Sequence, residues 1–337
     1  MNLEKSFRVL FLSLFVVVVF AKLANATQEI KKWLRPENIP VPVDNKITPA
    51  RVELGKLLYF DPSLSRDGTI SCANCHNPLM GWSDNQPKAI GVEGREGPRN
   101  SPTVLNTAYQ IRQFWDGRAK TLEEQALGPI QADVEMDMNL DFLLSKLNKN
   151  MGYVALFQRA YPSEGITDKT LAKAIATFER TIVSTEAPFD KFIQGDKEFI
   201  SKSAQDGFKV FIGKAHCADC HDGFNFTDGS FHNIALGGRD EGRYKIKKRA
   251  AWFHAFKTPT LRDIVKSAPY FHDGSVKTLK EATTICATGG RYPNGKNIST
   301  FIKDRNLSET EIDNIVEFMK TLSGKTLTVL IPTKFPQ

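Results

Sequence analysis

A chain of 337 residues is long enough for two domains of ordinary size, each with its own core. Its hydrophobic fraction of 41% and charged fraction of 25% are typical of a soluble globular protein. The net charge of +7 is modest and the Lys and Arg residues are scattered, which argues against a nucleic-acid partner. The exception is the run from Lys245 to Arg249, which we interpret as a solvated loop, with an acidic docking partner as the alternative.

The N-terminus has the pattern of a secretory signal. Lys5 and Arg8 precede the apolar run Val9–Ala21, and Ala24–Ala26 is a small-x-small cleavage site. The alternative, a membrane anchor, needs a longer apolar run than this one. We therefore predict a signal peptide over residues 1–26, export to the periplasm and no stable membrane anchor.

The rest of the chain favours helices separated by long loops. Apolar residues recur with helical spacing from Pro49 to Asp61, and again in Leu140–Leu147, Thr170–Ile182 and Glu309–Leu322. No segment shows the clear alternation of a strand. The Gly-, Pro- and Asn-rich stretches at 77–104 and 222–260 are too long for a compact domain unless something organises them. A buried bound group in each half is a suitable organiser.

Two short motifs indicate what that group is. Five cysteines are present, and in an exported protein disulfides are the first interpretation. Four of them, however, form two Cys-x-x-Cys-His units, Cys72–His76 and Cys217–His221, a pattern that marks covalent c-haem attachment. A single copy is compatible with a redox thiol pair or half of a zinc site. Two copies in an exported chain predict two haem c groups, attached through Cys72, Cys75, Cys217 and Cys220, with His76 and His221 as the proximal iron ligands.

The sequence also contains a weak internal repeat. Each half has a helix, a haem motif, a loop and then a Pro-Thr element, Pro102-Thr103 in the first half and Pro259-Thr260 in the second. An aromatic-Asp-Gly step follows each of them. We therefore predict a mainly α protein with two cytochrome c-like haem domains, residues 27–194 and 195–337, whose long loops pack across the interface between them.

The chain resembles the bacterial di-haem cytochrome c peroxidase family, which includes the MauG-type enzymes. The resemblance covers most of the mature chain. It is carried by Arg99–Asn106, Gln113–Ala119, Glu124–Ala126, Gly128–Ile130, Val134–Met136, Phe256–Arg262 and Pro269–Gly274.

The resemblance implies an unequal pair of haems. The haem on His76 would be peroxidatic, with Glu135 as the distal acid-base carboxylate and Gln125 beside it. Trp115 would lie between the two haems. Chemistry supports the assignment, because breaking a peroxide O–O bond needs a proton moved between its oxygens, and a carboxylate in a largely apolar pocket can move it. Without the resemblance these three residues would be an ordinary acidic residue, a surface amide and a core aromatic.

The resemblance further implies a calcium ion between the domains, held by the side-chain amide of Asn100 and the backbone carbonyls of Ser267 and Pro269. Hard oxygen ligands of this kind suit calcium. It also implies hydrogen peroxide as substrate, a small cytochrome c or cupredoxin as electron donor, and a homodimer, although nothing in the residues themselves requires a dimer.

Two positions depart from the family pattern. Many family peroxidases carry a removable histidine ligand sixteen residues after the proximal one, where this chain has Val92. We therefore expect a first haem that is open without reductive activation. On the second haem the family places methionine in peroxidases and tyrosine in the MauG type, where this chain has Cys286. A thiolate can bind haem iron, although a free cysteine is also commonly a small buried apolar residue.

Three functions follow for comparison. The first is a cytochrome-c-peroxidase-type oxidoreductase that reduces hydrogen peroxide to water. The second is a MauG-type enzyme that uses a high-valent state to oxidise a partner protein or another substrate, although Ala215 stands where that type carries its surface tryptophan. The third is a non-catalytic di-haem electron carrier, against which Glu135 and Gln125 argue, because a carrier needs no acid-base pair.

Overall fold

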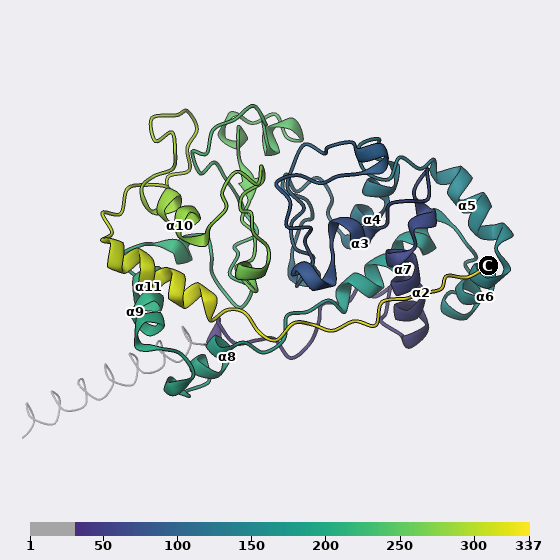
Figure 1. Cartoon of the computed structure of the whole chain (residues 1–337), viewed down its shortest axis with the longest axis horizontal. Helices are drawn as coiled ribbons and strands as arrows, with labels where there is room; N and C mark the ends of the chain where they lie inside the picture. The colour runs from purple at the N-terminus through teal and green to yellow at the C-terminus, as the bar shows by residue number, and fades with distance from the viewer. Residues whose placement is uncertain (1–30) are drawn as a thin grey trace, which may run out of the picture.

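The structure is a computed structural model that describes residues 31–337 (Figure 1). The predicted signal peptide lies outside the described residues. Among residues 31–337, no helix combines the length and the apolar character needed to cross a membrane.

The described chain is mainly helical, as the sequence predicted. Its two named strands are each two residues long and pair antiparallel, with Phe231 opposite Lys257. The α-helices and strands are α2 (Pro49–Phe60), α3 (Cys72–Cys75), α4 (Leu122–Gln131), α5 (Leu140–Lys149), α6 (Met151–Ala160), α7 (Asp168–Arg180), α8 (Pro188–Ile193), α9 (Lys202–Ile212), β1 (Phe231–His232), β2 (Phe256–Lys257), α10 (Leu279–Ala287) and α11 (Glu309–Lys320).

All four helices expected from periodicity are present, as α2, α5, α7 and α11. Each begins at a residue whose side-chain oxygen accepts a backbone N–H of the first turn, as Ser308 does from Glu311 at 3.2 Å. The periodicity did not indicate α4, whose ten residues include Gly128 and Pro129, two residues that normally disfavour a helix. A Thr121 cap, donated to by the Glu124 N–H at 3.1 Å, helps this helix to form.

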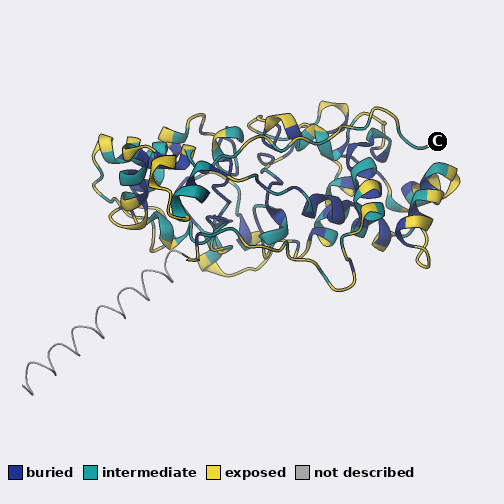
Figure 2. Cartoon of the chain, turned by 90° about the horizontal axis from the view of Figure 1, so that it is seen from below, coloured by how far each residue is buried: buried dark blue, intermediate teal, exposed yellow. Residues whose placement is uncertain are grey.

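The first half of the molecule is built on the contact of α2 with α7. Leu54 and Leu58 of α2 are fully buried and pack with Leu171 and Phe178 of α7 in one apolar cluster. The two backbones touch at Gly55, where an added Cβ would lie 2.0 Å from the Ala174 carbonyl oxygen. Glycine is therefore required there for the helices to pack. Figure 2 shows buried segments inside the molecule and exposed ones on its outer side.

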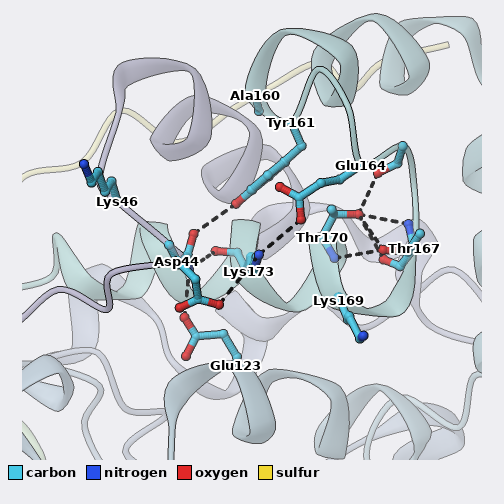
Figure 3. A network of polar contacts seen from close by, with 12 residues as sticks. Asp44, Lys46, Glu123, Ala160, Tyr161, Glu164, Thr167, Lys169, Thr170 and Lys173 are labelled. Carbon is cyan, nitrogen blue, oxygen red and sulfur yellow. Dashed lines mark hydrogen bonds and ion pairs between the residues drawn. The ribbon is translucent and has the colours of Figure 1, made fainter.

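Polar contacts fix the orientation of α7. In Figure 3, Lys173 lies between Glu164 at 3.1 Å and Asp44 at 3.7 Å, which ties the helix to the loop before it and to the N-terminal segment. At the end of the helix, the Arg180 guanidinium donates two hydrogen bonds to Glu123 of α4, at 2.7 and 2.9 Å. These contacts matter for the site because α7 and α4 both supply side chains to it.

The second half is built on the contact of α9 with α11. An aromatic cluster fills this core, with Phe318 of α11 5.0 Å from Phe211 of α9, ring centre to ring centre. The helices again touch at a glycine, since a Cβ on Gly207 would lie 1.8 Å from the Asn314 carbonyl oxygen. Below the cluster, the fully buried Arg262 pairs with Asp190 at 2.7 Å.

Both ends of the described chain pack on the half that is more distant in sequence. Trp33 lies in the aromatic core of the second half before the chain crosses to α2. At the other end, Leu327, Val329 and Phe335 pack against the core of the first half, and the Asn150 side chain donates to the Pro336 carbonyl at 2.8 Å. This tail runs back across the molecule in Figure 1. The two halves are therefore tied together by crossing segments as well as by their interface.

Loops make the interface between the halves, as the sequence predicted. Arg99 of the first half forms two hydrogen bonds with the Asp240 carboxylate of the second, at 2.6 and 2.9 Å. Arg243 of the second half donates to the carbonyls of Asp116 and Gly117, at 2.7 and 2.6 Å. Gly117 has a φ of +63° and lies against the Phe231 ring, where a Cβ would be 2.2 Å from the ring, so this close approach requires glycine.

Candidate functional site

A single large cavity of about 1070 Å³ joins the two halves. It exceeds the usual range of small-molecule sites, about 300–1,000 Å³. Its wall contains residues of both haem motifs, including Cys75, His76, Cys217, Cys220 and His221. The structure thus brings the two motifs, far apart in sequence, to one space.

The first motif forms a single helical turn. Ser71 caps α3, and its backbone N–H donates to the Asn74 side chain at 2.8 Å. The His76 backbone N–H closes the turn on the Cys72 carbonyl at 2.9 Å, and the Tyr59 hydroxyl donates to the His76 carbonyl at 3.1 Å. Burial lowers the pKa of His76, which favours the neutral imidazole that binds metals.

The second motif has a different local geometry. Cys217–Asp219 form a 3₁₀ turn, entered through His216 at a φ of +54°. The His221 Nδ1 lies 2.9 Å from the Phe226 carbonyl oxygen. As a donor to that carbonyl, Nδ1 carries the proton, and Nε2 is left with the lone pair that an iron atom needs.

These residues fit two haem c groups. None of the four motif cysteines is in a disulfide, so each has a free thiol for a thioether bond. Each pair lies on one turn of backbone, next to its histidine. The cavity that Cys75, Cys217 and Cys220 border has a mostly apolar surface contributed by both halves, as an apolar macrocycle requires.

Three predicted catalytic side chains line this cavity. Glu135 lies in the turn after α4, where burial raises the pKa of its carboxyl and the Arg118 guanidinium partly opposes the shift. Gln125 is on α4, and its buried Oε1 has no hydrogen-bond partner within the described residues. Trp115 donates its indole N–H to the Asn100 carbonyl at 2.9 Å, and its own carbonyl accepts from the Lys257 N–H of the second half at 2.8 Å. The structure therefore brings the three together.

The loop that carries Val92 packs behind Glu135 and not into the cavity. Val92 is fully buried, its side chain is absent from the cavity wall, and its N–H donates to the Glu135 carbonyl at 2.8 Å. Gly91 lies so close that a Cβ would be 2.4 Å from the same oxygen. Met80 also lies outside the cavity wall and is 43% exposed. Neither residue is placed to block the first haem.

Two sulfur-bearing side chains outside the haem motifs also line the cavity. Cys286 of α10 lines the cavity, close enough to Cys217 for the two thiols to influence each other's charge. Burial raises the pKa of Cys286 to about 11. Met319 of α11 is buried at 5% exposure and also borders the cavity.

The three residues expected to hold calcium, Asn100, Ser267 and Pro269, all border the same cavity. The Asn100 amide N–H donates to the Gln86 carbonyl at 2.8 Å, which leaves its oxygen as the group that faces other partners. No acidic cluster accompanies them among residues 31–337. The one group of three metal-binding side chains there is Cys220, Asp228 and His232, and its cysteine is a haem attachment point.

Two further residues of the cavity wall were not predicted from the sequence. Glu179 of α7 is 4% exposed, and burial raises the pKa of its carboxyl to about 8. Lys257 of β2 is 8% exposed, contacts the Gln110 side chain, and has its pKa lowered to about 8 by burial. Two features of the sequence could have indicated them. Glu179 is an acidic residue inside an apolar helix pattern, and Lys257 is a lysine inside the segment Phe256–Arg262 that resembles the family.

Models of known protein families match both halves of the chain. The family model described as di-haem cytochrome c peroxidase matches residues 49–198, and the one described as cytochrome c matches residues 204–323.

Individual relatives span nearly the same length. The methylamine utilization protein MauG of Methylorubrum extorquens is 43% identical over 305 residues, which is 89% of this chain and 86% of that protein. The cytochrome c551 peroxidase of Pseudomonas aeruginosa is 36% identical over 301 residues, 86% of this chain and 83% of that one. A crystal structure of a MauG-like protein associated with microbial copper homeostasis superposes with a TM-score of 0.80 at 29% identity, covering 87% of this chain and 95% of that one.

Proposed function

The chain belongs to the family of di-haem cytochrome c peroxidases and MauG proteins, and from this premise we propose that it reduces hydrogen peroxide to water with electrons from a small redox protein. It is an oxidoreductase with two covalently bound haem c groups. The observation that carries the proposal is that Glu135 and Gln125 both line the cavity that is also bordered by His76. A half-buried carboxyl with a raised pKa and an amide beside the same cavity have no use in a simple electron carrier.

The haems, when bound, supply the irons that exchange electrons with donor and substrate. His76 and His221 would be their proximal ligands, and the four motif cysteines would hold them covalently. Lys257 has a role in binding them as well. Its buried ammonium group has no carboxylate within 4.0 Å in the described chain, and a haem propionate would supply the missing negative charge.

Glu135 performs the proton step in this proposal. Its carboxylate accepts a proton from one peroxide oxygen and returns it to the other, which makes the second oxygen a water-like leaving group. A pKa raised by burial suits both half-steps, because the group must gain and lose the proton readily near working pH. Gln125, whose Oε1 lacks a partner, would orient the peroxide by a hydrogen bond.

Trp115 supports electron transfer between the two sites. Its side chain is held by Asn100 of the first half, and its backbone is held by Lys257 of the second. Its ring centre lies 6.5 Å from that of His272, which stacks on Phe256 at 3.5 Å. We propose that the rings of Trp115, His272 and Phe256 form the contact between the halves through which electrons pass. Reduction of one peroxide to two waters consumes two electrons and two protons, so two donor encounters are needed.

The loop of Val92 favours a first haem that reacts without prior reduction. No histidine, methionine or cysteine of this loop is available as a second axial ligand, because residues 90–94 contain none. The test is to add peroxide to the fully oxidised protein, with and without prior half-reduction, and to follow the absorption spectrum and turnover. Equal rates support the proposal, and a requirement for half-reduction contradicts it.

A MauG-type activity is the second candidate, in which the same site oxidises a partner protein. Two observations favour it: a relative at 43% identity is named MauG, and Cys286 replaces the methionine of the peroxidases. Against it, Ala215 is 6% exposed and offers no surface aromatic before the second motif. Fast turnover with a reduced cytochrome supports the peroxidase, and a long-lived oxidised state with poor turnover supports the MauG type. Absence of any reaction with peroxide would leave the electron carrier.

We further propose that Cys286 would bind the iron of the second haem together with His221. The residue lies on the cavity wall with that motif, and its thiol has no disulfide partner. Iron would lower the pKa of the thiol from its raised value, because metal binding stabilises the thiolate. An anionic ligand stabilises ferric iron, so this haem would have a lower potential than one with methionine. Met319 is the competing sulfur on the same wall.

The remaining proposals concern surroundings of the site. We propose a calcium ion at Asn100, Ser267 and Pro269, and removal of calcium with a chelator should then change the haem spectrum and re-addition should restore it. A spectrum that does not respond contradicts this site.

We also propose export to the periplasm, a domain boundary at residue 194, and a cytochrome c or cupredoxin as donor. Sedimentation of the purified protein tests the expected homodimer.

A further inference from the structure

A closed loop rich in cations stands at the mouth of the cavity. Residues 239–254, here called the basic lobe, connect β1 to β2. Their ends are joined by the Arg243 N–H to the Ala255 carbonyl at 2.8 Å and by the His254 N–H to the Glu241 carbonyl at 3.1 Å. A loop closed at its base in this way presents its outer residues in a defined arrangement.

Two arginine contacts fix the basic lobe beside the first half. Arg243 is 4% exposed and donates to the carbonyls of Asp116 and Gly117, next to Trp115. Asp240 pairs with Arg99 at 2.6 Å. Lys245 and Ile246 of the lobe belong to the cavity wall. The lobe is therefore an edge of the cavity that holds both haem motifs, and any molecule seated on it lies next to that cavity.

The charge of the basic lobe is strongly one-sided. It contains six Lys and Arg residues and two carboxylates, a net charge of +4 out of +7 for the whole chain. Both carboxylates already have a partner, Asp240 in Arg99 and Glu241 in Lys248 at 3.8 Å. All residues from 245 to 251 are exposed, and no carboxylate lies within 4.0 Å of Lys245, Lys247 or Arg249 in the described chain. Such a patch attracts an acidic surface.

Aromatic residues lie among these cations. Trp252 is half-buried, with the Arg249 guanidinium 5.0 Å and the Arg243 guanidinium 5.5 Å from its ring centre. Lys248 lies 4.7 Å from the Tyr244 ring, and Ile246 is 39% exposed. Trp and Arg are the residues that most often dominate binding energy at protein interfaces. The combination of exposed cations with aromatic rings is therefore more typical of a binding surface than of a loop that contacts only solvent.

We propose that the basic lobe is the docking surface for an acidic redox protein that delivers electrons to the haems. The inference rests on the proposed function, because it requires that the chain accepts electrons from a protein. In each encounter one electron leaves the reduced metal of the partner and enters the haems of this chain. Two encounters supply the two electrons that reduce one peroxide. Lys245 and Lys247 attract the partner, and Trp252 contacts it.

The test uses reduced plastocyanin, a small acidic copper protein, as the probe. Its peroxide-driven oxidation by the holoprotein is followed by stopped flow over a range of salt concentrations. We expect the rate constant to fall steeply with salt. The double variant Lys245→Glu/Lys247→Glu should lower it on the order of tenfold or more at low salt and flatten the salt dependence. The matched variant Lys149→Glu/Lys169→Glu, with the same charge change on exposed lysines of α5 and α7, should leave the rate within about twofold.

The Trp252→Ala variant separates contact from attraction. It should slow plastocyanin oxidation while keeping the salt dependence, since no charge changes. Equal plastocyanin rates for the lobe and control variants would overturn the proposal. So would faster oxidation of mitochondrial cytochrome c, a basic protein, than of plastocyanin. Lobe-dependent binding to phosphatidylglycerol vesicles without an effect on plastocyanin would overturn it in favour of a membrane surface.

Hydroquinone, a neutral small donor, distinguishes failure of the docking surface from failure of the proposed function. If hydroquinone is oxidised with peroxide but plastocyanin is not, the peroxidase function stands and the docking proposal fails. If neither is oxidised, the proposed function fails. The haem absorption spectra of all variants confirm that each retains both haems.

Discussion

The two haem sites share a five-residue motif but little else. The first motif is a helical turn capped by Ser71, and the walls of its site carry Glu135, Gln125 and Glu179. The second is a 3₁₀ turn, its histidine is held by the Phe226 carbonyl, and its walls carry the sulfur of Cys286 and Met319. One site presents two carboxyls with raised pKa values and an amide, and the other presents the sulfur atoms of a cysteine and a methionine.

The difference teaches that attachment and role are separate properties. The Cys-x-x-Cys-His unit would tether each haem and supply a histidine ligand to its iron. Residues that come from elsewhere in the fold would set the chemistry of each haem. In the first half these are supplied by α4, the turn after it and α7, and in the second half by α10 and α11.

The largest expected effect is on the acid-base side of this comparison. Glu135→Gln keeps the shape of the side chain but removes the proton carrier, so we expect peroxide turnover to fall by a factor of about 10²–10⁴. Below its raised pKa Glu135 is protonated and cannot accept a proton. The wild-type rate should therefore rise with pH on a limb that lies above pH 4.5 and is absent from the variant.

Steady-state rates from pH 4 to 9, with haem content measured by absorption, check this expectation. Asp133→Asn, an exposed neighbour two residues away, is the matched control and should behave as wild type. A Glu135→Gln enzyme with unchanged turnover would remove the distinction between the two sites.

The proposed binding of Cys286 to the second haem is tested by substituting this residue. Electron paramagnetic resonance of the oxidised protein should show a low-spin thiolate signal that Cys286→Met replaces with that of a methionine-ligated haem. The reduction potential of this haem should rise, since a neutral ligand stabilises ferric iron less than an anionic one. Met319→Leu is the control and should leave the spectrum unchanged. Identical spectra of wild type and Cys286→Met would show that the cysteine is not a ligand.

The buried acid of the first half should be visible in stability. Glu179 has a folded-state pKa of about 8 against 4.5 for an exposed carboxyl, so it is neutral in both states below pH 4.5 and costs stability as pH rises towards 8. Glu179→Gln removes this cost and should stabilise the protein at pH 7 by up to about 3 kcal/mol, with little effect at pH 4.

Denaturant unfolding of the holoprotein at both pH values measures the gain. Glu186→Gln, on an exposed side chain, should show no such dependence on pH. Equal stability changes for Glu179→Gln at pH 4 and pH 7 would mean that the carboxyl is ionised in the fold.

The smallest expected effect concerns the contact between the halves. Arg99 lowers the pKa of Asp240 to about 2, so the pair stabilises the fold above pH 3.8 and its contribution is lost as pH falls towards 2. Asp240→Asn should cost about 1 kcal/mol at pH 7, because the pair is partly exposed and Arg99 retains Asp116. Urea unfolding compared with that of Asp133→Asn measures the loss, and a cost that persists at pH 2 would contradict an ionic origin.

Resemblance to a family supplied the predicted roles of Glu135, Gln125 and Trp115. The structure places all three on the wall of one cavity, and their roles stay predictions. Glu179, Lys257 and Arg243 could not be found in the same way, because a buried charge is recognised only by what surrounds it. In sequence, Arg243 is an ordinary cation two residues before the basic run Lys245–Arg249. In the fold it is 4% exposed and joins the two halves.

The sequence by itself determined the local features of this protein. Covalent haem attachment depends on five consecutive residues, and α2, α5, α7 and α11 depend on apolar spacing and a capping residue. Three arrangements are visible only in the folded chain. The two motifs share one cavity, the loop of Val92 packs behind Glu135, and the basic lobe lies at the cavity edge. The physical reason is that these arrangements depend on contacts between residues far apart in the chain, which no local pattern records. The two identical attachment motifs thus become two different sites through long-range packing.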